Sequence, residues 1–381
     1  MRVSHAALRY FPALGGAEEY VRSVCEALAK RGHEVHVVAS DLEQHARRLR
    51  LSDCSGEQEM NGVHVSRVTT KYLPGLSGYP VMPSLLPTLV KQRPDVVHGH
   101  CFFYSSADIS AVAARILRRP FVLNPYFYLP PGRNWRAYCA TLGRLAMDAD
   151  VVIAISDYEK DLITRAGMRV RRFEVVPPGV ETAEFDGGGD DVYASFNINR
   201  CAARVVLFVG RLHRSKGVDT LIAAMPTILR CEPETILFLV GPDWGDRARF
   251  TRQIQDLGLE SKVVLAGPLN RSELVSAYRG AALMVLPSTY EAFGIVLIEA
   301  MAARLPVVAS NAAAIPYVVS HGETGLLFPM GDHAALANCV VALLRDEHLR
   351  RPMGERGRSI VERRYERVEQ IRSLEEIYES L

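Results

Sequence analysis

Two glutamates interrupt an otherwise apolar stretch, YEAFGIVLIEAMAARLPVVAS, at residues 290–310. Glu291 precedes a predicted helix, and Glu299 lies about 8 Å along that helix at about 1.5 Å per residue. A buried carboxylate is costly unless a polar group meets it. The two acids therefore predict contacts with different parts of one elongated ligand, and a carboxylate is an ordinary acceptor for the vicinal hydroxyls of a ribose.

Two neighbouring segments are suited to an anion. Gly294 opens the helix without a side chain in the way, so the amides of Gly294, Ile295 and Val296 are expected to point at an anion in front of it. Arg211 and Lys216 follow the strand-like run VVLFVG and precede a glycine and a helix. Two cations beside helix amides are suited to a diphosphate, whereas the alternative interpretation is a solvated loop.

The elements around these candidates alternate between strand and helix. Short β-branched runs are each followed by a turn and an amphipathic segment, as in RVSHAAL and then GGAEEYVRSVCEALAKRG. The same alternation returns later in RVVLFVG, TILFLVG, KVVLAG, ALMVLPS and LPVVAS. This pattern predicts an α/β protein with doubly wound parallel sheets.

The chain length and one break in the pattern predict two domains. A chain of 381 residues exceeds one ordinary core. Three glycines beginning at Gly187 and flanked by acids mark a linker. We therefore expect Rossmann-like domains at 1–186 and 201–365 that face each other across a cleft, a linker at 187–200, and a C-terminal helix at 366–381 that packs back on the first domain. Ligands are expected at the carboxyl ends of the strands.

Composition excludes several classes of function. Lys+Arg 45 against Asp+Glu 43 gives no support for a nucleic-acid partner. The seven scattered cysteines favour neither a disulfide framework nor a zinc site. The absence of a leader and of a long apolar run predicts a cytoplasmic protein, with contact to the inner membrane face and the oligomeric state left open. Asp148 and Asp150 imitate a metal-binding pair but are expected to be structural.

The Glu291–Glu299 spacing resembles the E-x7-E motif of the retaining glycosyltransferases of family four, which have the GT-B fold. Other segments follow in the order of that family: GGAEEYVRSVCEALAKRGHEVHVV, PDVVHGH, DVVIAIS, FVGRLHRSKGVDTLIAAM and GETGLLFPMGD. The resemblance covers nearly the whole chain.

This resemblance implies a hexosyltransferase that moves a sugar from a nucleotide-diphosphate sugar to a hydroxyl acceptor, either a glycan, a lipid-linked molecule or a small molecule. Retention of configuration by front-face attack is expected, without a metal or other cofactor. Arg211 and Lys216 are expected at the donor diphosphate and Glu299 at the ribose. Glu291 is expected to face the donor sugar, beside the amides of Phe293, Gly294, Ile295 and Val296.

The first domain contributes further expected residues. By the same resemblance the loop of Gly15 and Gly16 lies under the phosphates and the acceptor. His100 resembles the family histidine that approaches the donor sugar, and His98 is its rival. Several aromatic residues either line an acceptor groove or belong to the core: Phe121, Tyr126, Phe127, Tyr128 and Trp135.

Two segments depart from the family pattern. Pro178 stands where an asparagine is common before the glycine, and residues 312–317 replace a Gly-Gly pair followed by Pro-Glu. The base and sugar preferences of other members are therefore not carried over. Two alternative functions stay open: an epimerase or hydrolase of the same fold, which needs no acceptor, and a non-catalytic nucleotide-sugar-binding protein, which releases no nucleotide.

Overall fold

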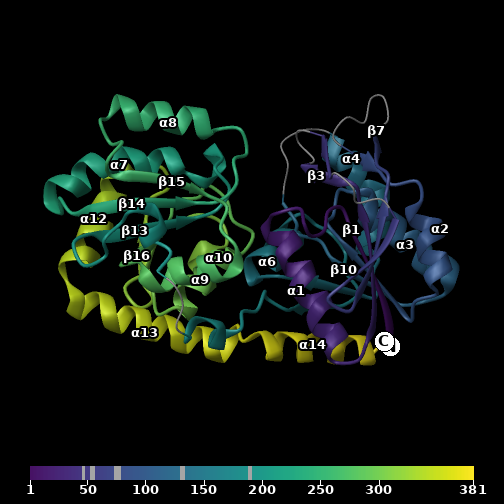
Figure 1. Ribbon diagram of the computed structural model, residues 1–381. Helices are drawn as coiled ribbons and strands as arrows, with labels where there is room; N and C mark the ends of the chain where they lie inside the picture. Colours follow the sequence, from purple (N-terminus) through teal and green to yellow (C-terminus); the bar gives the residue numbers. More distant parts are fainter. Residues whose placement is uncertain (45–47, 52–55, 73–78, 129–133, 188–190) are drawn as a thin grey trace. The chain divides into compact units, whose positions relative to one another are not determined.

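The chain forms two compact units in the computed structural model (Figure 1). Unit 1 comprises Met1–Pro177 and Gln370–Leu381, and unit 2 comprises Pro178–Glu369. The structure describes residues 1–44, 48–51, 56–72, 79–128, 134–187 and 191–381, with the side chains of 134–136 left out.

The chain first passes between the units at Pro177 and Pro178, before the predicted linker at 187–200. Of the three linker glycines, Gly188 and Gly189 lie outside the described residues. The residues that follow them pack in unit 2: Tyr193 is buried, and its hydroxyl donates to the carbonyl of Ala277 at 2.6 Å.

Unit 1 contains an eight-stranded sheet in the order β12-β11-β10-β9-β1-β2-β6-β5. All of its neighbours pair in parallel except β5 and β6. Because β1 lies between β2 and β9, the strand order reverses between β1 and β9, where ligands bind in doubly wound folds. Its strands are β1 (Arg2–Ala7), β2 (Glu34–Ser40), β5 (Gly56–Met60), β6 (Val63–Val68), β9 (Val96–His100), β10 (Phe121–Asn124), β11 (Val151–Ala154) and β12 (Phe173–Val175). Two further antiparallel pairs are β3 (Leu42–Gln44) with β4 (Leu49–Arg50), and β7 (Lys71–Tyr72) with β8 (Pro80–Val81).

The helices of unit 1 follow the strands in the alternation that the sequence predicts. They are α1 (Gly16–Lys30), α2 (Leu85–Gln92), α3 (Ser105–Leu117), α4 (Asn134–Ala140), α5 (Leu142–Met147) and α6 (Asp157–Arg165). The last helix, α14 (Arg367–Glu379), also joins this unit from Gln370 onward. Its Glu375 accepts from Arg31 at 2.7 Å and meets His33 at 2.9 Å.

Unit 2 contains a six-stranded, fully parallel sheet in the order β15-β14-β13-β16-β17-β18. Its strand order reverses between β13 and β16. The strands are β13 (Arg204–Val209), β14 (Thr235–Val240), β15 (Val263–Gly267), β16 (Leu283–Leu286), β17 (Val307–Ser310) and β18 (Gly325–Phe328). The helices are α7 (Val218–Cys231), α8 (Arg247–Asp256), α9 (Arg271–Gly280), α10 (Ile295–Ala302), α11 (Ile315–Val318), α12 (His333–Arg345) and α13 (Glu347–Arg364), with 3₁₀ turns η1 (Thr182–Phe185), η2 (Ala194–Phe196) and η3 (Arg214–Lys216).

The central strands are apolar because helices cover both faces of a parallel sheet. Every residue of β16 and β17 is buried, and so is β13 after Arg204. The prediction of an α/β protein with two doubly wound parallel sheets is therefore confirmed. No helix among the described residues combines the length and the apolar character that a membrane span requires.

Candidate functional site

The loops after β13 and β16 meet where the strand order of unit 2 reverses. The amide of Thr289 donates to the carbonyl of Ser215 at 2.9 Å. Gly217 has φ 65°, and a Cβ added to it would overlap the carbonyl oxygen of Pro287. Glycine therefore permits both the left-handed backbone and the close approach of the two loops.

We expect Gly217→Ala to destabilise unit 2 by about 1–3 kcal/mol more than Gly258→Ala does, because only the former adds an overlap inside a packed region. Gly258 is a matched control, since it has the same φ of 65° and no atom within 4 Å of an added Cβ. Urea-induced unfolding of both variants measures the difference. Equal loss of stability would show that the loops can separate at no cost.

Lys216 and Glu291 join these loops by a salt bridge. Lys216 Nζ lies 2.6 Å from Glu291 Oε1, and both side chains are mostly buried, at 14% and 12% exposed. Ser288 Oγ donates to the same oxygen at 2.7 Å. Both of these bonds end on Oε1, and Oε2 of Glu291 has no partner among the described residues. An ammonium group has three donors. Lys216 can therefore hold Glu291 and still donate to an anion.

Helix α10 begins beside this pair. Its N-cap Gly294 has φ 94°, and the first intrahelical bond runs from the amide of Leu297 to the carbonyl of Gly294 at 2.9 Å. The amides of Ile295 and Val296 precede that bond and are therefore among the donors that a helix leaves for a cap or ligand. Phe293 is buried, with its ring 5.5 Å from that of Tyr365, so only its backbone is suited to a ligand.

Glu299 lies further along α10 and is held by two side chains of α9. Its Oε1 accepts from Arg271 Nη1, and its Oε2 accepts from the hydroxyl of Tyr278 at 2.9 Å. Its side chain is 8% exposed. Each carboxylate oxygen has two acceptor positions, so one position on each oxygen stays open for a hydroxyl.

Arg211 belongs to the same loop as Lys216 but has a different neighbour. Its guanidinium lies 4.1 Å from the ring centroid of Trp244. The loop of Trp244 is tied to this position, because the amide of Leu212 donates to the carbonyl of Pro242 at 2.8 Å. Stacking on an indole orients a guanidinium.

Residues 312–317, which differ from the family pattern, also contact the site. The amide of Ala314 donates to the carbonyl of Glu291 at 3.1 Å. Ala313 has φ 48°, in the left-handed region that a glycine adopts more easily. The segment therefore keeps a glycine-like backbone and positions Glu291.

The glycines of unit 1 have different surroundings. Gly15 is the N-cap of α1, and a Cβ added there would overlap the carboxylate of Glu18, which pairs with Arg9 at 2.5 Å. Gly16 has no atom within 4 Å of an added Cβ. Gly15 thus makes room for a buried ion pair, and Gly16 leaves open space at the helix start.

His100 is the last residue of β9 and lies in a buried cluster with His98 of the same strand and His5 of the neighbouring strand β1. His5 Nδ1 and His100 Nε2 are 3.0 Å apart, and His100 Nδ1 is 3.0 Å from the hydroxyl of Tyr126. The rings of His98 and His100 stack with centroids 4.3 Å apart. Burial, together with the neighbouring histidines, lowers the pKa of His5 and of His100 well below the usual value. Burial likewise lowers the pKa of His98 to about 3.

A backbone carbonyl fixes the tautomer of His98. Asn124 Nδ2 donates to the carbonyl of Ile153 at 2.8 Å, so Asn124 Oδ1 is the acceptor that faces His98 Nε2 at 2.8 Å. His98 therefore has its proton on Nε2, and its Nδ1 accepts from the hydroxyl of Tyr378 at 2.6 Å.

The histidine cluster does not fit a metal ion. The ligand atoms of its three members lie within 4.8 Å of one another. However, both ring nitrogens of His98 and of His100 already have partners, and stacked rings do not direct their lone pairs at one point. Asp148 is held by Arg115 and Arg171, each at 2.8 Å, and Asp150 accepts from the amide of Phe121 at 2.9 Å, which are structural contacts.

Comparison with known proteins agrees with this geometry. Residues 198–360 match the family Glycosyl transferases group 1, and residues 14–184 match Glycosyltransferase Family 4. The chain is similar to a D-inositol 3-phosphate glycosyltransferase of Corynebacterium jeikeium, at 32% identity over 90% of this chain and 86% of the relative. A relative of the same name from Acidothermus cellulolyticus is 31% identical over 87% of this chain and 78% of its own length.

The chain belongs to glycosyltransferase family 4. Solved structures with similar folds include the sucrose-phosphate synthase of Thermosynechococcus elongatus, with a TM-score of 0.80 at 24% identity over 100% of this chain and 98% of that one. Anabaena HepE has a TM-score of 0.80 at 23% identity, with 100% of both chains covered. These comparisons confirm the predicted family, the GT-B fold and the glycosyltransferase class.

The predicted residues of this family 4 chain divide between the two units. Lys216 and Glu291 come together in unit 2, and the other predicted residues there are Arg211, Phe293, Gly294, Ile295, Val296 and Glu299. Gly15, Gly16 and His100 belong to unit 1. Their contacts with a donor stay predictions. Sequence reasoning missed His5, Trp244, Arg271 and Tyr278, although an arginine and a tyrosine seven residues apart at the start of a helix indicate a shared face.

The aromatic residues proposed for an acceptor groove have mixed surroundings. Phe121 and Phe127 are buried in the core of unit 1. Tyr126 contacts His100, and Tyr128 is 41% exposed. The side chain of Trp135 lies outside the described residues.

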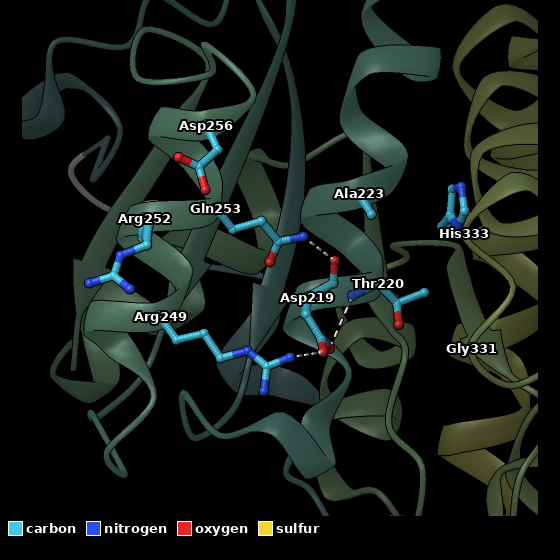
Figure 2. A pocket seen from close by; sticks show the side chains of 9 residues that line it. All are labelled: Asp219, Thr220, Ala223, Arg249, Arg252, Gln253, Asp256, Gly331 and His333. Atoms are coloured by element: carbon cyan, nitrogen blue, oxygen red, sulfur yellow. Dashed lines mark hydrogen bonds and ion pairs between the residues drawn. The ribbon is translucent and has the colours of Figure 1, made fainter.

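A hollow of about 490 Å³ lies between α7, α8 and the turn at residues 331–333 (Figure 2). Arg249 reaches Asp219 across it at 3.1 Å, and Gln253 donates to the carbonyl of Asp219 at 2.9 Å. None of the predicted site residues lines it. Two of its charged side chains, Arg249 and Asp219, pair with each other (Figure 2). A cation, a carboxylate and helix amides come together instead at the loops after β13 and β16, which we therefore favour as the site.

Proposed function

We propose that this glycosyltransferase moves a sugar from a nucleotide-diphosphate sugar to a hydroxyl acceptor, with retention of configuration and without a metal. The observation that carries the proposal is the Lys216–Glu291 pair, at 2.6 Å, beside the start of α10. A cation, a carboxylate and helix amides thus lie together where the strand order reverses, and doubly wound sheets bind nucleotides at such positions.

The donor class is supported by a neighbour in fold. Structures of Anabaena HepE contain UDP, UDP with glucose, and UDP-glucose. In this chain, Lys216 and Arg211 would hold the diphosphate, Glu291 the sugar hydroxyls and Glu299 the ribose. The segment at residues 312–317, which differs from the family pattern, contacts Glu291. The sugar and the base of the donor must therefore be measured for this chain.

The reaction that fits these residues is a front-face displacement. The acceptor oxygen bonds to the anomeric carbon from the side of the leaving group while the bond to the phosphate oxygen breaks. The electron pair goes to the diphosphate, whose oxygen takes the proton of the acceptor hydroxyl. Lys216, Arg211 and the amides of α10 then stabilise the growing charge, and the protein acts mainly by positioning and electrostatics.

The acceptor supplies only a hydroxyl in this mechanism. The relatives named above are glycosyltransferases of D-inositol 3-phosphate, a phosphorylated polyol. A glycan, a lipid-linked sugar or a small polyol would each present such a hydroxyl to this chain. We propose Gly16 and the open space beside it as part of the approach for phosphates and acceptor, with His100 near the donor sugar.

A donor and acceptor screen in excess EDTA tests this function. We expect nucleoside diphosphate release that requires an acceptor and persists in EDTA, because cations of the protein neutralise the diphosphate. Proton NMR of the product should show the anomeric configuration of the donor. Release without acceptor would favour the hydrolase alternative. Activity that is lost in EDTA and restored by Mg²⁺ or Mn²⁺, or an inverted product, would contradict the proposal.

A further inference from the structure

Arg271 connects the predicted ribose carboxylate to a second acid. Its Nη1 donates to Glu299 Oε1, while its Nε and Nη2 both donate to Glu184 Oε2, the former at 3.0 Å. Glu184 belongs to η1, which follows the point where the chain enters unit 2. One guanidinium therefore holds two carboxylates from distant parts of the sequence.

The backbone of α9 fixes where Arg271 starts. Asn270 caps the helix by accepting from the amide of Glu273 at 3.0 Å, and Glu273 accepts from the amide of Asn270 at 2.8 Å. Tyr278 lies two turns further on the same face of α9 and donates to the other oxygen of Glu299. Since both side chains are anchored on one capped helix, the two oxygens of Glu299 have defined positions.

The arginine is also accessible enough to act beside a ligand. Its side chain is 36% exposed, whereas that of Glu299 is 8% exposed. A lysine at this position would keep the charge but lose the planar fork that reaches both acids. Glu299 would then lose the orientation that the fork fixes and could turn away from a ribose.

We infer that Arg271 is a positioning residue that orients the carboxylate of Glu299 for the ribose hydroxyls of the donor, and that Glu184 holds Arg271 in place. This inference rests on the proposed function, in which Glu299 accepts from the ribose. Arg271 itself need not touch the donor. Replacing Arg271 is therefore expected to change the ratio of the affinities for nucleotides with and without the ribose hydroxyls.

Calorimetric titration with UDP, GDP and ADP and their 2′,3′-dideoxy analogues tests the inference. For the base that binds, the wild type should prefer the ribonucleotide about tenfold or more, as expected for hydrogen bonds to a charged group. Arg271→Lys should reduce this ratio to below about threefold on the same basis. Glu184→Gln should reduce it as well, which keeps the test valid if Arg271→Lys fails to fold.

Arg279→Lys is the matched control, because Arg279 is an exposed arginine of the same helix. It should leave the ratio unchanged. A merely structural loss in Arg271→Lys would weaken both ligands equally and preserve the ratio, which would overturn the inference. If the wild type itself shows no preference, the ribose assignment of Glu299 fails, and the inference fails with it.

Discussion

Lys216→Ala is expected to lower kcat at saturating donor by about 100- to 1,000-fold, or about 2.7–4 kcal/mol. Departure of the nucleoside diphosphate concentrates negative charge as the glycosidic bond lengthens. A cation beside that oxygen gains strength in the transition state, whereas a contact with the ribose acts equally in the ground state. The donor KM should therefore change less than kcat for Lys216→Ala, and more than kcat for Glu299→Ala.

Arg214→Ala is the control for this experiment. Arg214 lies in the same loop and is exposed. Its backbone amide donates to Asp246 at 2.8 Å and its carbonyl accepts from the amide of Gly217 at 3.0 Å, and Arg214→Ala keeps both of these backbone groups. Its replacement should leave kcat nearly unchanged. If Lys216→Ala keeps more than about a tenth of the wild-type kcat, a margin below the expected range, the diphosphate lies elsewhere. Because Lys216 also holds Glu291, Glu291→Gln belongs in the same series, and a double variant shows whether the two side chains act as one unit.

The buried histidine cluster is expected to make unit 1 sensitive to acid. The pKa values of His5, His98 and His100 are lowered in the folded state, chiefly by burial. Below about pH 6.5 the folded state therefore binds fewer protons than the unfolded state. Stability contributed by these groups is present above that pH and is lost as the pH falls. The unfolding free energy should therefore fall between about pH 7 and about pH 5, by up to about 2 kcal/mol for a histidine that stays neutral in the folded state.

His5→Asn isolates this effect. The amide of asparagine occupies the position of Nδ1 and can keep the bond to His100, but it does not titrate in this range. The loss of unfolding free energy between about pH 7 and about pH 5 should be about 2 kcal/mol smaller than in the wild type. His64→Asn, at an exposed position of β6, is the control. Burial raises the pKa of Asp108 to about 6 and that of Glu159 to about 7. These carboxyls favour the folded state as the pH falls, which opposes the effect of the histidines. The effect of His5 is therefore read from the difference between the variant and the wild type. An unchanged loss in His5→Asn would show that His5 is not kept neutral by the fold.

The sequence predicted the strands and the site loops of unit 2 because their signals are local. An apolar run that ends in a glycine and a cation marks the end of a parallel strand, as before Arg211. Lys216 and Glu291 are 75 residues apart, however, and their pairing follows from the strand order that places β13 beside β16. Local patterns indicate which side chains could bind a ligand, but not which of them bind each other.

Other features depended on packing that no local pattern carries. His5 is one residue of a short strand, and only the register that pairs it with His98 shows the cluster. The glycine stretch flanked by acids predicts a linker, but it does not indicate which core the residues after it join. Tyr193 and its neighbours pack on α9 of unit 2, and the chain enters that unit earlier, at Pro178. Pro177 and Pro178, between which the chain enters unit 2, do not by themselves predict a domain boundary.

Hydrogen–deuterium exchange with saturating nucleoside diphosphate shows whether the donor binds where β13 and β16 end. UDP, GDP and ADP are compared with the free protein. We predict slower exchange at residues 211–217 and 291–297 for at least one nucleotide, with no protection of α8. Protection confined to the hollow between α7 and α8, or none at the two loops despite binding, would show that the donor binds elsewhere.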